Sequence, residues 1–115
     1  MVTKDPYQAL DAEARVLMAS LLEAATHAAL AVVRDDGTPS VTRIALSVEK
    51  DRPPVTLISD LSLHTKALRA GRPCSVLLGE PGDKGDPLTH PRLTLHCVPK
   101  FVTREDAGFG KAYRV

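Results

Sequence analysis

The chain has 115 residues, of which 43% are hydrophobic and 25% charged, and its formal net charge is +1. This length and composition indicate one ordinary globular domain, residues 1–115. A near-neutral charge, 3% aromatic residues and no Trp argue against a nucleic-acid partner, because single-strand binders use positive grooves and stacking rings. The sequence shows no membrane-spanning run and no leader, so we expect no membrane partner and a cytoplasmic location.

The first predicted element is a helix over about residues 8–25. Asp5 followed by Pro6 and Gln8 is typical of a helix start. Apolar residues then recur at helical spacing, at Leu10, Ala14, Leu17, Leu21 and Ala25. We expect this helix to lie as a lid on a sheet. His27 is expected to end it, because an imidazolium suits the negative end of the helix dipole.

A β-hairpin is predicted next, with strands over 28–34 and 41–49. Asp35-Asp36-Gly37 forms its turn, since Gly accepts the positive φ that such turns require. The second strand alternates between two faces. Its buried face is expected to carry Ile44, Leu46 and Val48, and its opposite face Arg43, Ala45 and Ser47.

The second half of the chain predicts further strands around one helix. We expect strands over 55–59, 74–79 and 92–101, a helix over 62–70 that ends at Gly71, a loop over 80–91, and a helix start at Thr103. In the last strand Leu93, Leu95 and Cys97 are expected inward, and Thr94 and His96 outward. Five short strands with short connections predict an α+β, mainly β fold: a small antiparallel barrel with flanking helices.

Two cysteines, Cys74 and Cys97, lie within these apolar strands. They are expected to be reduced core residues rather than a disulfide, and no C-x-x-C spacing or His/Cys cluster predicts a metal site. No Ser-His-Asp or Cys-His arrangement is visible, so no catalytic residue is assigned and a cofactor is expected to supply the chemistry.

The junction after the third predicted strand is the candidate binding site. A helix N-terminus offers free N–H groups, and side chains there suit a phosphate group; they are Ser59, Ser62, His64, Thr65 and Lys66. The alternative is a solvated helix turn without a ligand. Arg43 is a further candidate, although for this residue alone a surface salt bridge explains the position equally well.

Two segments resemble a known family. Residues 57–68, Leu-Ile-Ser-Asp-Leu-Ser-Leu-His-Thr-Lys-Ala-Leu, resemble the flavin-phosphate segment of the pyridoxamine 5′-phosphate oxidase-like split barrels. Residues 75–95 contain Leu-Gly-Glu-Pro, Gly-Asp-Pro-Leu and His-Pro-Arg, and resemble the heme-utilisation branch of that superfamily. The resemblance implies an FMN-binding split β-barrel that is a homodimer with flavin in shared grooves. The usual C-terminal continuation is not recognisable after residue 106, so the chain is expected to be a C-terminally shortened member.

Residue by residue, the resemblance implies that the FMN phosphate is bound by Arg43, Ser59, Ser62, His64, Thr65 and Lys66. Leu63-His64 stands where the oxidase has Arg-Lys, so oxidation of vitamin B6 is not expected. The leading prediction is an FMN-dependent, oxidoreductase-like protein with a small-molecule flavin ligand. One alternative is a heme-binding or heme-degrading protein, in which heme ligation by the outward His96 is the lesser possibility beside a solvent or interface position. The other alternative is a non-enzymatic split-barrel dimer without flavin.

Overall fold

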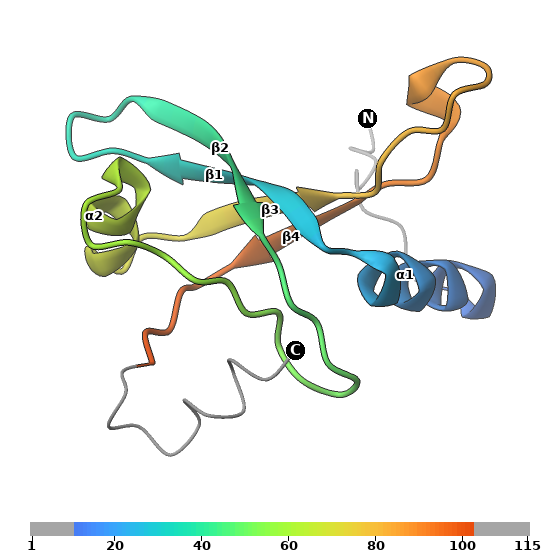
Figure 1. The fold of residues 1–115 in the computed structure, drawn as a ribbon, viewed down its shortest axis with the longest axis horizontal. Coiled ribbons are helices and arrows are strands. Elements are labelled where there is room, and N and C mark those ends of the chain that lie inside the picture. Colours follow the sequence, from blue (N-terminus) through green and yellow to red (C-terminus); the bar gives the residue numbers. More distant parts are fainter. Residues whose placement is uncertain (1–10, 103–115) are drawn as a thin grey trace, which may run out of the picture.

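The structure, a computed structural model, describes residues 11–102. Four strands form one antiparallel sheet in the order β2-β1-β3-β4, and helices flank it (Figure 1). The α+β class with an antiparallel sheet is therefore confirmed. In chain order the elements are α1 (Ala12–Ala24), β1 (His27–Val33), β2 (Pro39–Ala45), α2 (Leu63–Arg69), β3 (Cys74–Leu78), a 3₁₀ turn (Pro87–Thr89) and β4 (Leu93–Cys97). The helix starts predicted at Asp5 and Thr103 lie outside the described residues.

Helix α1 begins later than predicted and is not a lid. Asp11 is its N-cap, and the Asp11 carboxylate accepts a hydrogen bond from the Ala14 N–H at 2.7 Å. No α1 residue is buried, and Val16 is 68% exposed. Only Leu21 and Leu22, near the end of the helix, pack against the core. The apolar spacing predicted the helix correctly. However, most of the apolar residues of α1 do not pack against the sheet within the described residues.

His27 opens β1 instead of ending the helix. The chain leaves α1 when Ala25 becomes extended and its N–H bonds to the Leu22 carbonyl. The Nε2 atom of His27 then lies 2.8 Å from the Glu80 carboxylate, so the imidazole faces a side chain and not the helix dipole.

The β1–β2 hairpin agrees with the prediction. The pairing runs from His27 opposite Ala45 to Val33 opposite Pro39. Gly37 has φ 85° in the turn, where residues with a side chain are strained. Strand β2 ends at Ala45, earlier than predicted.

The prediction of a strand over residues 55–59 is wrong. This segment makes only one isolated bridge, between Ser47 and Val55. Pro53 and Pro54 before it have no N–H to donate, and Thr56 instead donates its hydroxyl to the Ala45 carbonyl at 2.5 Å. The described sheet therefore has four strands instead of five, and it stays open.

One face of this sheet builds the core and carries α2. Helix α2 adds two buried residues, Ala67 and Leu68, to a cluster in which Ile44 and Leu46 are also buried as predicted. The other buried members come from the strands: Ala28, Leu30, Val32, Val76 and Leu78. No helix of residues 11–102 buries side chains on the opposite face, which we call the open sheet face. Within the same residues, no helix is long and apolar enough to cross a bilayer.

Candidate functional site

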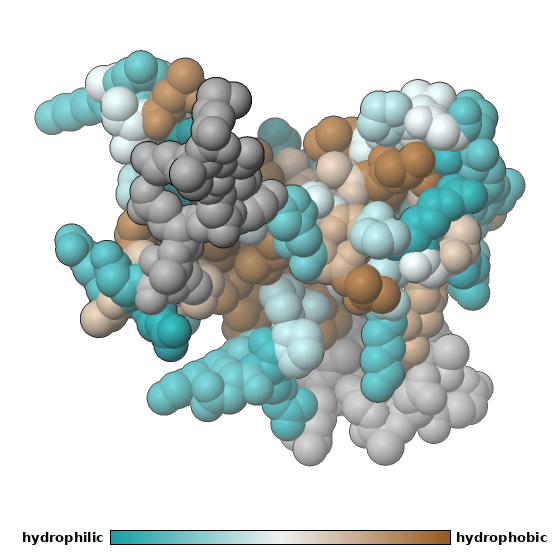
Figure 2. Space-filling view, turned by 180° about the vertical axis from the view of Figure 1, so that it is seen from behind, coloured by the Kyte–Doolittle hydropathy of each residue, from teal (hydrophilic) through white to brown (hydrophobic). Residues whose placement is uncertain are grey.

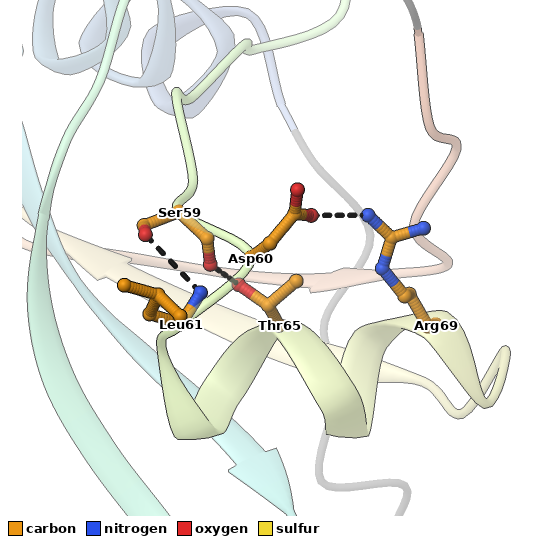
Figure 3. Close-up of polar contacts among 5 residues, drawn as sticks. All are labelled: Ser59, Asp60, Leu61, Thr65 and Arg69. Atoms are coloured by element: carbon orange, nitrogen blue, oxygen red, sulfur yellow. Dashed lines mark hydrogen bonds and ion pairs between the residues drawn. The ribbon is translucent and has the colours of Figure 1, made fainter.

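The predicted phosphate junction is a compact turn with internal hydrogen bonds (Figure 3). Thr65 is 1% exposed, and its hydroxyl donates to the Ser59 carbonyl at 2.5 Å. The Ser59 hydroxyl accepts from the Leu61 N–H at 3.2 Å. Two of the predicted hydroxyl contacts are thus already engaged in fixing the loop onto α2.

The remaining residues of the junction face different surroundings. Ser62 is the N-cap of α2, but its side chain makes no capping hydrogen bond. His64 is partly exposed, and Lys66 is exposed. Helix α2 has only 7 residues, so its dipole is small compared with that of a longer helix.

Lys66 shares a small cavity with two carboxylates, whose negative charge disfavours an anionic ligand there. It lines a small cavity of about 230 Å³ together with Asp35 and Asp36 of the β1–β2 turn and with Arg34. The Thr38 main-chain N–H donates to Asp36 at 2.9 Å and lowers the pKa of that carboxyl. Asp36 therefore stays ionised near the ammonium group.

Arg43 is not brought to this junction within the chain. Ile44 is buried in the core, and neighbouring residues of a strand point to opposite faces. Arg43 therefore lies on the open sheet face, as the alternation predicted, whereas α2 covers the core face. Among residues 11–102, the guanidinium forms no ion pair with a carboxylate.

The open sheet face carries a second candidate site, which the sequence indicated only through the outward position of His96. Strand register aligns Val41, Ala31, Ser75 and His96 in one row across all four strands. Directly opposed residues of antiparallel strands share a face, so the row lies on one surface.

The next row on the same face also combines apolar and polar residues. It contains Arg43, Ala29, Leu77 and Thr94. Val41 is 68% exposed and Leu77 is 44% exposed, so the open sheet face exposes apolar side chains together with a few polar ones. Figure 2 shows apolar side chains toward the middle of the view and hydrophilic side chains projecting at its rim.

A cavity of about 440 Å³ opens at one end of this face. It forms where β1 and β3 separate, because their pairing ends at Ala31 and Ser75. Its volume falls within the range of small-molecule sites, which is roughly 300–1,000 Å³. Its lining is mainly apolar and consists of Ala31, Val32, Val33, Pro39, Pro73, Cys74, Ser75 and His96.

Two side chains of the cavity could ligate a metal ion. His96 places Nδ1 2.9 Å from the Ser75 hydroxyl oxygen. Cys74 is a free, half-buried thiol opposite Cys97 across β3–β4. Burial, and then the neighbouring Cys97, raise the pKa of Cys74, so this thiol stays protonated. Residues 11–102 hold no group of three or more His, Cys, Asp or Glu side chains that could bind a metal ion by itself.

Comparison with known proteins points to heme proteins. No family model matches the chain. Over 72 residues, 62% of this chain, it is 33% identical to the non-canonical heme oxygenase HOZ, a chloroplast protein of Arabidopsis thaliana. The chain spans 21% of the length of that relative.

Two solved structures share the fold. HutZ, described as the heme storage protein of Vibrio cholerae, superposes with a TM-score of 0.71 at 21% identity, over 83% of this chain and 67% of its own. A heme-binding protein of Mycobacterium smegmatis superposes with a TM-score of 0.69 at 23% identity, over 84% of this chain and 40% of its own. The chain is thus similar in fold, and over its HOZ-matched part in sequence, to proteins named for heme oxygenation, heme storage and heme binding.

Proposed function

We propose that this chain is a heme-binding module of a heme-utilisation protein. The observation that carries the proposal is the 33% identity to the heme oxygenase HOZ over 62% of this chain. The two heme proteins of similar fold add support, although at 21% and 23% identity they support only the assignment of the fold. In this proposal the fold is the split barrel of the heme-utilisation branch.

The open sheet face suits a heme in shape and chemistry. A porphyrin is flat and largely apolar and carries carboxylates at one edge, and the open sheet face combines apolar side chains with Arg43. Heme iron is commonly held by a protein side chain such as His, and the open sheet face carries His96. Bound heme would supply one-electron and O₂ chemistry, while the protein would bind it, orient it and exclude water.

A second copy of the chain is the proposed cover of the open sheet face. Soluble domains rarely leave a contiguous apolar sheet surface exposed, and residues 11–102 contain no helix that buries it. A homodimer would cover Val41 and the neighbouring row of Arg43, Ala29, Leu77 and Thr94, while the cavity lined by Ala31, Ser75 and His96 would stay accessible to a ligand.

The flavin hypothesis has less support. None of the three relatives compared above is named for a flavin. Within one chain, Arg43 and α2 lie on opposite faces of the sheet, and Lys66 shares its cavity with Asp35 and Asp36. FMN binding, and a dimer that binds neither ligand, are therefore the competing outcomes of the test.

Parallel titrations with hemin and with FMN distinguish these functions. A ligand that binds only the folded state stabilises it, by about 2.7 kcal/mol when its concentration is 100 times Kd. We expect hemin to raise the melting temperature saturably and to develop a protein-specific Soret band, and FMN to do neither. Stabilisation by FMN and not by hemin would contradict the heme proposal and support the flavin hypothesis. A dimer that neither ligand stabilises would support the non-enzymatic alternative.

A further inference from the structure

The four histidines of the chain all lie in its described part, and they differ in how many ring nitrogens are free. His27 uses both: Nε2 lies 2.8 Å from the Glu80 carboxylate and Nδ1 lies 3.2 Å from the Thr26 hydroxyl. His90 also uses both, since Nδ1 accepts from the Gly82 N–H and Nε2 lies 2.6 Å from the Lys84 carbonyl. These two imidazoles cannot bind a metal ion without losing those contacts.

His96 is arranged differently. Its Nδ1 faces the Ser75 hydroxyl at 2.9 Å, whereas no described residue forms a hydrogen bond with its Nε2. A hydroxyl oxygen that accepts the Nδ1 proton fixes the tautomer in which Nε2 keeps its lone pair. Metal-binding histidines almost always have such a partner on the other ring nitrogen.

The surroundings of His96 also suit a heme. The imidazole lines the apolar cavity of about 440 Å³ and shares it with a single thiol, that of Cys74. Cys74 is half-buried and packs against the core, whereas His96 is exposed on the open sheet face. His64 lacks a hydrogen-bond partner among residues 11–102 as well, but it lies on α2 and lines neither cavity.

From this geometry we propose that His96 binds the heme iron through Nε2 at the cavity between β1 and β3, and that Ser75 is the residue that positions its ring. The inference rests on the proposed function, since it names the ligand of the same heme. It places the iron at the end of the open sheet face and away from the junction at α2.

The test uses the full chain loaded with hemin and compares H96Q, S75A and H64A with the unchanged protein. His64 and His96 both have an unbonded nitrogen, so H64A is the matched control. The readouts are the ferric absorption spectrum, the iron–histidine stretch of the ferrous form in resonance Raman spectra, and the hemin Kd. Melting curves without hemin check that each variant folds. Because His96 is exposed, H96Q should fold, and H96G with added imidazole provides a second variant that restores the ligand.

We expect H96Q to lose the iron–histidine stretch and to weaken hemin binding by about tenfold or more, and S75A to weaken it by about tenfold. Imidazole added to H96G should restore the spectrum, and H64A should match the unchanged protein. If H96Q keeps the spectrum and Kd of the unchanged protein, the assignment of His96 is wrong while heme binding stands. If the unchanged protein binds no hemin, both the assignment and the proposed function are wrong.

Discussion

At the residue scale, Thr65 was predicted to contact a phosphate group, but its side chain makes a hydrogen bond within the protein. Its side chain is 1% exposed, and its hydroxyl holds the Ser59 carbonyl over the first turn of α2 (Figure 3). T65V removes the donor and leaves a hydroxyl-sized apolar group in its place. Because the Ser59 carbonyl keeps only the weaker contact from the Ser62 N–H at 3.1 Å, we expect the free energy of unfolding to fall by about 1 kcal/mol.

Urea denaturation of T65V beside S59A measures this difference. S59A removes an exposed hydroxyl that only accepts from Leu61, so its effect should be clearly smaller. A T65V variant as stable as the unchanged protein would show that the buried hydrogen bond contributes nothing.

The sequence indicated that these residues lie close together at the start of α2, but it did not indicate the direction of their side chains. Helix α2 ends just before Gly71, as the stop signal indicated. However, whether the Thr65 hydroxyl faces a ligand or the Ser59 carbonyl depends on the path of the preceding loop. That path is fixed by tertiary packing, which residue spacing does not report.

At the element scale, the loop between β3 and β4 depends on the close approach of two chain segments at Gly79. Gly79 has φ 104°, and a Cβ at this position would lie 2.7 Å from the Pro91 carbonyl oxygen and 2.9 Å from the Arg92 Cα. G79A must therefore push the two ends of the loop apart. We expect it to destabilise the protein by more than the roughly 1 kcal/mol that an unfavourable backbone conformation alone costs.

Gly85 provides the matched control in the same loop. Its φ is 79°, but a Cβ there meets nothing within 4 Å, so G85A measures the conformational cost alone. Thermal or urea unfolding of both variants compares the two costs, and equal destabilisation would show that the contact with Pro91 and Arg92 is not limiting.

Element types were predictable where local chemistry decides them. The Asp-Asp-Gly hairpin and the end of α2 required only turn and stop residues close in sequence. The strand over 55–59 was predicted from its apolar composition, but its pairing partner had to come from elsewhere in the chain, and only Ser47 supplies one. The prediction that α1 covers the sheet was wrong for the same reason, because apolar residues at helical spacing do not specify which surface they pack against.

At the scale of the whole molecule, the uncovered sheet face predicts self-association. V41K places a charge on that face, where Val41 is 68% exposed, and burying an unpaired charge strongly opposes an interface. We expect the unchanged protein to sediment as a dimer at micromolar concentration and V41K as a monomer.

L61K is the control for the added charge, because Leu61 is 94% exposed in the loop before α2. It should leave the dimer intact. A monomeric unchanged protein, or a V41K dimer of normal strength, would contradict the role assigned to the open sheet face.

Hydrogen–deuterium exchange of the protein with and without hemin tests most directly that heme binds at the open sheet face. The account predicts slower exchange of main-chain amides around the cavity, in residues 31–33, 74–75 and 94–97, with little change around the α2 junction. Protection confined to residues 59–66, or no protection at saturating hemin, would contradict it.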